Sequence, residues 1–233
     1  MKIRLLLIAV SLSMSALPAV WGKDAVVASI KPKDLIEYEL APPEIQKLIE
    51  DCLKLTKMKL AYGYGTNSPS QGSMDCSGAV QHVIQMQGIK DVPRMSHLQY
   101  VWADQTKWPD KPSGLTKVKK VYDTDHPDLA GLRPGHLLFW EGTYDVKKRN
   151  PPISHVMIYL GRLKKDGQGV MFGASSGRRF RGLKIHGVSV FDFKVPTKSS
   201  KAKFVAYGRI PQLIKIEGAG PAPKKKLGLF KKR

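Results

Sequence analysis

Segments with helical periodicity precede segments with strand periodicity along this chain. Apolar residues recur at helical spacing over 43–55, and a second helix is predicted over roughly 75–87, ending at Gly88. A short strand is predicted near 118–122, and from residue 136 onward the pattern favours strands at 136–141, 155–163, 169–175, 183–191 and 203–210. Strands that alternate with helices would predict a parallel sheet. Helices followed by strands instead predict an α+β fold, with the helices packed on an antiparallel sheet.

Length and composition narrow the class of protein. The 233 residues suit one domain with flanking segments, and 42% hydrophobic with 25% charged residues excludes wholesale disorder and collagen-like repeats. Two cysteines, Cys52 and Cys76, exclude a small disulfide-stapled scaffold. The Cys and His residues do not have zinc-site spacing, so we expect no metal and no other cofactor.

The net charge of +20 favours anionic partners. Residues 1–22 begin with Lys2 and Arg4, continue with an apolar stretch, and offer small residues for cleavage, which is typical of a secretory signal peptide. The alternative, a membrane anchor, would need about 20 apolar residues, and serines and Pro18 interrupt this run. An exported, periplasmic or extracellular protein meets peptidoglycan, acidic wall polymer and lipid head groups, so we expect no nucleic-acid partner.

The rest of the chain divides into a lead-in strap (23–42), a folded domain (43–212) and a basic, flexible tail (213–233). The tail combines seven Lys and Arg residues from Lys215 onward with several glycines and prolines. Two interpretations remain open for it: an electrostatic tether to anionic wall polymer or lipid, or a solvated segment with no specific partner.

Asp75-Cys76-Ser77-Gly78 follows a glycine-rich loop and opens the second predicted helix. Free N–H groups and the dipole at a helix N-terminus stabilise a thiolate, and the same groups can hold an oxyanion. The alternative is a structural cysteine at a helix start. Cys52 lies on an apolar helix face, where a buried, unreactive thiol is expected.

A nucleophilic cysteine needs a base, and the chain has six histidines. In the predicted strand from His155, alternation places Met157 and Tyr159 on the same face as the imidazole. His136 opens another apolar strand, so spacing alone ranks it close to His155.

Motifs along residues 60–177 resemble the NlpC-type cell-wall peptidases, which are papain-like cysteine endopeptidases of bacterial peptidoglycan. The matching motifs occur in the family's order: Tyr62-Gly63-Tyr64-Gly65, Asp75-Cys76-Ser77-Gly78-Ala79-Val80, Gly88-Ile89, Pro93-Arg94, Gln99, Pro134-Gly135-His136-Leu137-Leu138-Phe139-Trp140, Ser154-His155-Val156-Met157-Ile158-Tyr159-Leu160-Gly161 and Ala174-Ser175.

The resemblance implies a papain-like fold in which Cys76 is the nucleophile and His155 the general base. It implies cleavage of the γ-D-glutamyl-diaminopimelate bond of a peptidoglycan stem peptide. Tyr62, Asp75 and Ser77 match the positions at which relatives bind a free L-Ala amine, and a carboxylate such as Asp75 suits an ammonium group. A plain helix cap is the alternative role for Asp75.

The sequence departs from the family pattern at two site positions. The polar residue that orients the catalytic histidine is replaced by Gly173, which leaves the third catalytic group unknown, with Ser175, His186 and His136 as candidates. His136 itself stands where the family usually has Asp. A Cys/His dyad and an inactive binding protein therefore remain open. Basic residues at 147–149 and 178–181 are additions that could attract substrate carboxylates if they flank the cleft.

Alternatives from other functional classes follow from these departures. One is a catalytically impaired cell-wall-binding protein of the same fold, and another is a related acyltransferase that passes the acyl group to an amine. The sequence leaves the oligomeric state unknown. The region before residue 60 is too short for the accessory domains that restrict substrates in many relatives.

Overall fold

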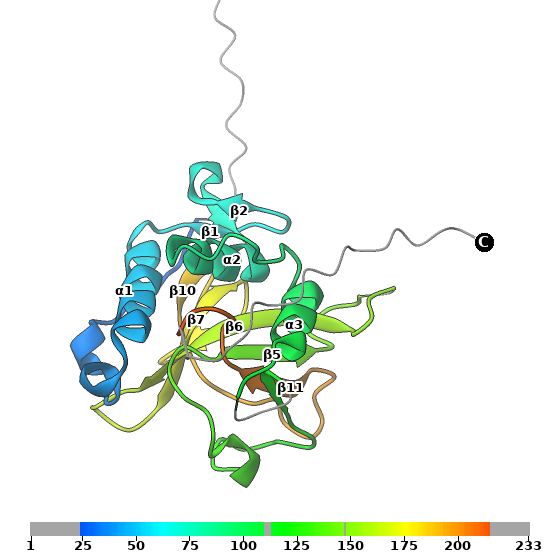
Figure 1. Ribbon diagram of the computed structural model, residues 1–233. Coiled ribbons are helices and arrows are strands. Elements are labelled where there is room, and N and C mark those ends of the chain that lie inside the picture. Colours follow the sequence, from blue (N-terminus) through cyan, green and yellow to red (C-terminus); the bar gives the residue numbers. More distant parts are fainter. Residues whose placement is uncertain (1–23, 110–112, 147, 215–233) are drawn as a thin grey trace, which may run out of the picture.

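Helices packed on an antiparallel sheet make up the described part of the chain. The computed structural model describes residues 24–109, 113–146 and 148–214 (Figure 1). Its helices are α1 (Pro43–Lys57), α2 (Cys76–Met86) and α3 (Ser96–Gln105), with short 3₁₀ turns at Pro32–Asp34, Tyr38–Leu40, Pro69–Gln71 and Pro127–Leu129. In Figure 1, α2 lies between α1 and α3.

The main sheet has six strands in the order β10-β7-β6-β5-β11-β4, and every neighbouring pair is antiparallel. These strands are β4 (Leu115–Lys117), β5 (Leu137–Glu141), β6 (Ile153–Arg162), β7 (Gly169–Ser175), β10 (Gly187–Asp192) and β11 (Lys203–Gly208). Before α2, a small sheet combines β1 (Ala61–Tyr62), β3 (Ser73–Met74) and β2 (Asn67–Ser68), and β8 (Arg179–Phe180) pairs with β9 (Leu183–Lys184). The predicted α+β class is confirmed.

The two faces of the sheet bury different clusters. Val156, Ile158 and Leu160 pack with the three helices in one core, whereas Met157 and Tyr159 belong to a second core on the opposite face. This confirms the alternation that the sequence predicted for β6. Aromatic side chains dominate the second core, namely Trp140, Phe191, Phe193, Phe204 and Tyr207.

Helix α1 follows its sequence pattern closely. Pro43 occupies the first helical position, where the missing N–H has no partner to lose. Leu48, Ile49 and Cys52 are fully buried against the sheet. Burying each such leucine or isoleucine stabilises the fold by about 1.5–3 kcal/mol. Burial also raises the pKa of the Cys52 thiol well above its usual value, so this cysteine is the unreactive structural one.

The lead-in strap packs along the domain. Leu35 is fully buried, and Val26 and His186 exchange backbone hydrogen bonds across an isolated bridge. The expected signal segment (1–22) and all but the first two residues of the expected tail lie outside the described residues. Within the described ranges, the helices are too short or too polar to cross a membrane.

Three local features differ from the sequence prediction. Helix α3 was not predicted, because its buried residues, Ser96, Gln99 and Ala103, are small or polar and form no apolar stripe. The short strand expected at 118–122 lies earlier, at β4, where it pairs with β11. The expected strand 183–191 is divided between β9 and β10, because Leu183 pairs with Phe180 in a separate hairpin.

Candidate active site

Cys76 is the first residue of α2, and its position is set by the cap that starts this helix. The side chain of Asp75 accepts a hydrogen bond from the Gly78 backbone N–H at 2.7 Å, as the sequence predicted for an N-cap. A Cβ atom at position 78 would overlap the backbone oxygen of Thr66. Glycine there lets the loop approach the helix closely and holds Cys76 at the junction.

Burial dominates the ionisation of the Cys76 thiol. The residue is 4% exposed, and burial together with the negative charge of Asp75 raises its pKa to about 11. Backbone N–H groups of Val156 and Ser77 donate to the sulfur and lower the pKa, as does the charge of Arg94. The sequence predicted a lowered pKa at the helix N-terminus. The net direction is the opposite, because removal of water from the sulfur outweighs these donors.

His155 enters the same region from the start of β6. Its neighbour Val156 donates a backbone hydrogen bond to the Cys76 sulfur, which places β6 against Cys76. The imidazole is 7% exposed and packs on Trp140, with 5.7 Å between ring centroids. Burial and the positive charge of Arg178 hold the pKa of His155 well below its usual value. Thiol and imidazole are therefore both neutral at rest, and the imidazole is free to accept a proton.

A small cavity opens onto Cys76. Its volume is about 230 Å³, and the three residues predicted to bind substrate, Tyr62, Asp75 and Ser77, all line it. Six further side chains complete the wall: Tyr64, Arg94, Met95, Ser96, Tyr144 and Arg149. Of these, the sequence predicted a place beside the cleft only for Arg149, and it assigned no site role to the other five. The described residues contain no group of three or more His, Cys, Asp or Glu side chains that could hold a metal ion.

Residues 59–190 match the model of the NlpC/P60 family, which is more than half of the chain. The chain belongs to the NlpC/P60 family. Members are generally cysteine peptidases of cell-wall peptidoglycan. A solved structure from Staphylococcus aureus subsp. aureus Mu50, described as similar to a lipoprotein of the NLP/P60 family, matches with 22% identity and a TM-score of 0.37. The match covers 64% of this chain and 36% of that protein, so this chain spans only part of its length. No curated protein sequence matches this chain significantly.

In this NlpC/P60 chain, the position expected to orient the histidine is closed by packing. A Cβ atom on Gly173 would lie 2.9 Å from Cγ of Met157 on the neighbouring strand. Met157 therefore fills the space that a polar side chain would need. Nε2 of His155 is buried and has no hydrogen-bond partner among the described residues.

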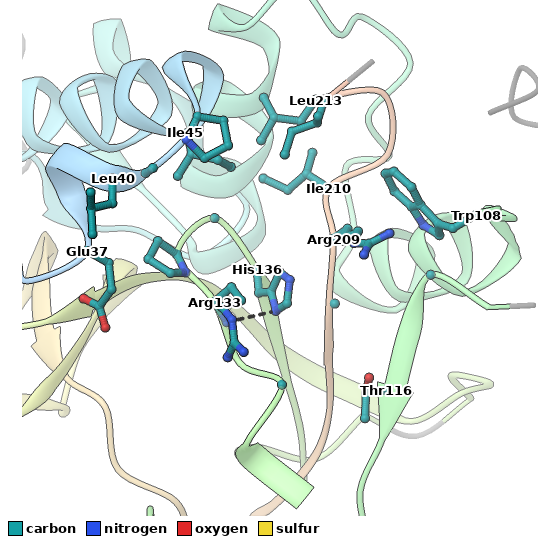
Figure 2. Close-up of a pocket in the computed structure, with 18 of the residues that line it drawn as sticks. Glu37, Leu40, Ile45, Trp108, Thr116, Arg133, His136, Arg209, Ile210 and Leu213 are labelled. Carbon is teal, nitrogen blue, oxygen red and sulfur yellow. Dashed lines mark hydrogen bonds between the residues drawn. The ribbon is translucent and has the colours of Figure 1, made fainter. Parts of the chain in front are cut away.

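The three candidates for the orienting role lie in different places. Ser175 ends β7 and pairs with Gly187 in β10. His186 lies edge-on to Tyr62, with 6.4 Å between ring centroids. His136 lines a separate cavity of about 780 Å³, which shares no lining residue with the Cys76 cavity (Figure 2).

His136 lies at the opposite end of β5 from the residue that pairs with His155. His136 precedes β5, whereas Trp140, near the other end of that strand, is the residue paired with His155. The His136 ring stacks on Tyr207. Its Nδ1 accepts a hydrogen bond from the Arg133 backbone N–H at 3.3 Å, which is the dashed line in Figure 2. Sequence spacing could not distinguish the two histidines, because it does not show which end of each strand meets α2.

Asp75 is engaged by Arg94 in a two-pronged ion pair. The guanidinium donates to Oδ1 at 2.9 Å and to Oδ2 at 2.6 Å, and also to the Ser77 hydroxyl at 3.0 Å. The Gly65 N–H adds a further bond to Oδ2 at 2.9 Å. Asp75 thus serves as helix cap and as the partner of Arg94, and an incoming ammonium would have to share this carboxylate. The sequence pointed to Pro93-Arg94 as a motif but gave Arg94 no role.

Replacing Arg94 should destabilise the fold. In Arg94→Met, the Asp75 carboxylate, 9% exposed, would keep its charge without its cation. Breaking a buried pair in this way costs about 3–5 kcal/mol. Because the Arg94 side chain is 30% exposed, we expect about 2–3 kcal/mol here, measured by urea unfolding. Lys47→Met is the matched control. Lys47 is 56% exposed and its partner Asp51 keeps Lys54, so this loss should stay below about 1 kcal/mol. Equal losses in the two variants would contradict the structural role of Arg94.

The loop between β5 and β6 contributes to the cavity wall. Arg149 donates to the Tyr144 hydroxyl at 2.9 Å and to the Ile153 carbonyl at 3.2 Å. Tyr144 in turn lies edge-on to Tyr64, with 6.2 Å between ring centroids. The sequence prediction that this basic insertion flanks the cleft is supported for Arg149, which lines the Cys76 cavity. Lys147 lies outside the described residues.

Proposed function

We propose that this chain is an exported cysteine peptidase that hydrolyses peptidoglycan stem peptides, with the γ-D-glutamyl-diaminopimelate bond as its target. The observation that carries this proposal is the position of Cys76. Its thiol opens onto a cavity at the N-terminus of α2, and β6, which packs against the sulfur through Val156, carries a buried His155 whose lowered pKa keeps it neutral. Family membership supports the reaction class and the polymer.

The mechanism follows from a neutral resting pair. His155 takes the proton from the thiol as Cys76 attacks the amide carbonyl, so the ion pair forms only during the reaction. The Cys76 backbone N–H, at the first helical position, donates no hydrogen bond among the described residues and is placed to donate to the oxyanion. The imidazolium then gives the proton to the leaving amine. In the second half, His155 removes a proton from water and the hydroxide attacks the thioester. The C–S bond then breaks to release the acid, and the imidazolium returns its proton to the Cys76 sulfur.

Charges around the cavity support an acidic peptide substrate. Arg94 and Arg149 line the wall next to Cys76, and Asp75 is held by Arg94. A stem peptide carries free carboxylates on its D-glutamate and diaminopimelate residues, and a guanidinium binds carboxylates with paired hydrogen bonds. Tyr62, Asp75 and Ser77 form the side at which a free L-Ala amine would bind.

One observation favours a second candidate, a cell-wall-binding protein with impaired catalysis. The buried Nε2 atom of His155 has no hydrogen-bond partner among the described residues, and Gly173 offers no side chain. An imidazole without an orienting group should be a slower base.

Incubation of the purified protein with the tripeptide L-Ala-γ-D-Glu-diaminopimelate and, separately, with intact sacculi tests the proposal. Products are identified by mass spectrometry, with an added amine acceptor to separate transfer from hydrolysis. Release of L-Ala-γ-D-Glu supports the proposed bond, and an amide of the acceptor would indicate an acyltransferase. Products from sacculi alone would move the substrate to intact wall. Sacculus binding without any product would support the binding protein.

A further inference from the structure

Arg178 brings a positive charge close to Cys76 and His155. The mechanism proposed above gives this charge no role. It lies between β7 and β8, and its backbone carbonyl accepts from the Ile185 N–H at 2.9 Å. Its guanidinium carbon lies 4.3 Å from the centre of the Trp140 ring. Within the described residues, no carboxylate pairs with this guanidinium and none of its N–H groups donates a hydrogen bond. Burying a cation without an anionic partner costs folding free energy. A functional role for the Arg178 guanidinium would explain why the fold bears this cost.

Trp140 connects Arg178 to the general base. The indole is fully buried on β5, and its register partner on β6 is His155. Arg178 lies over the indole ring, while the imidazole packs against the same indole at 5.7 Å between centroids. His155 has no hydrogen-bond partner at Nε2 among the described residues, so packing on Trp140 is what holds the ring orientation.

The charge of Arg178 also reaches both reacting groups. It adds to burial in lowering the pKa of His155. Burial lowers the pKa of Arg178 itself to about 10, while a negative charge on Cys76 acts to raise it. The guanidinium therefore remains positive at neutral pH, within electrostatic range of the sulfur and of the imidazole.

We propose that Arg178 is a positioning residue of this site, which clamps Trp140 against His155 and supplies the positive charge that stabilises the Cys76 thiolate as it forms. The proposal deepens the proposed function and rests on it. The proton passes from the sulfur to the imidazole and then to the leaving amine. A cation nearby makes the imidazolium a stronger acid, so it gives that proton up more readily. Packing by the clamped indole thus takes the place of the orienting side chain that Gly173 lacks.

Other charged and titratable groups near the thiol have partners of their own. Among the described residues, those that interact electrostatically with it include Asp75, Arg94, Tyr62 and Tyr144, and Arg149 lines the same cavity, where it donates to the Tyr144 hydroxyl. Asp75 and Arg94 form a bidentate pair and largely offset each other. Burial raises the pKa of both tyrosines above its usual value, so they stay neutral. The charge of Arg178, by contrast, acts on His155 as well as on the thiol.

The test compares Arg178→Met and Arg178→Lys in the full chain. All variants also carry Cys52→Ala, so that Cys76 is the one thiol left to react with the alkylating reagent. Arg179→Met is the matched control, since Arg179 is an exposed neighbour that donates to the Gly182 carbonyl. Two readouts need no substrate: the pH dependence of Cys76 alkylation by iodoacetamide, and the NMR titration of the His155 C–H signal, assigned with His155→Ala.

Loss of the charge and loss of packing predict opposite changes at the thiol. Without the cation the thiolate is less stable, so alkylation at about pH 9 should slow roughly threefold or more in Arg178→Met. Arg178→Lys, which keeps the charge, should alkylate close to the parent rate. If Arg178 only plugged the site, water would enter, the thiol pKa would fall, and alkylation would quicken. The His155 midpoint should rise in Arg178→Met and stay unchanged in Arg179→Met.

The outcomes separate the two proposals. Faster alkylation in Arg178→Met, or rates equal to those of Arg179→Met, would overturn the role of Arg178 whatever the substrate is. Slower alkylation in a protein that cleaves no peptide would leave the charge role intact and remove the proposed peptidase. Where peptide hydrolysis is seen, Arg178→Met should lower kcat about tenfold with KM changed far less, because the charge acts on the reacting groups.

Discussion

Cys76→Ala should reduce hydrolysis of the tripeptide by roughly 10⁴-fold or more, because removal of a nucleophile eliminates the covalent route entirely. The sulfur lies at the start of α2 and receives hydrogen bonds from backbone groups, so its loss removes the reacting atom and leaves the helix cap intact. Release of L-Ala-γ-D-Glu, followed by mass spectrometry, measures the effect. Urea unfolding of the same variant should show a loss below about 2 kcal/mol, since only one sulfur atom is removed.

Cys52→Ala is the matched control for this change. Cys52 is fully buried on α1, so its replacement should cost stability while turnover stays within about twofold of the parent. Residual turnover of Cys76→Ala at the parent rate, or equal losses in the two variants, would remove Cys76 from the reaction.

His155→Ala should lower kcat/KM by about 10²–10⁴-fold, the range that general acid–base catalysis contributes. The effect should lie mainly in kcat, because the imidazole transfers protons and does not line the Cys76 cavity. Steady-state kinetics on the same peptide measures it. A variant that changes KM alone would instead indicate a substrate-binding role.

The pH profile of the parent protein tests the direction in which the pKa of His155 is shifted. Because its pKa lies well below the usual imidazole value, His155 stays in the proton-accepting form as the pH falls through about 6.5. The acid limb of kcat/KM should therefore lie below that pH. An acid limb at or above pH 6.5, as for an exposed histidine, would show that the base titrates in solvent and would contradict the burial of His155.

Local patterns were enough to predict the elements that carry Cys76 and His155, the proposed catalytic pair. The cap at Asp75, the helix that begins at Cys76 and the alternation along β6 all depend on residues within a few positions of one another. The bounds of β7 were predicted as observed, because an apolar run between glycine-rich segments is a complete local signal. Helix α3 gave no such signal: its Gln99 is fully buried, and its side chain donates to the carbonyls of Ser77 and Pro93.

The groups that surround the proposed catalytic pair came from contacts between distant segments. Asp75 and Arg94 are 19 residues apart in the sequence. Two complete strands, β6 and β7, separate Trp140 from Arg178 along the chain, yet the two side chains are in contact. The spacing of apolar residues along the sequence does not predict such pairs, because side chains that come into contact only in the folded protein share no local pattern. The ionisation of Cys76 shows the same limit: the helix N-terminus predicted a lowered pKa, and burial raised it to about 11.

The sequence alone thus determined the α+β order of elements, the helix that presents Cys76, the strand that presents His155, and the family, since each is a pattern of short range along the chain. The tertiary structure decided which charges surround them: Arg94 on Asp75, Met157 in the space beside Gly173, and Arg178 on Trp140. The physical reason is that desolvation and electrostatic fields depend on everything packed around a group, and packing is known only when distant segments have been brought together.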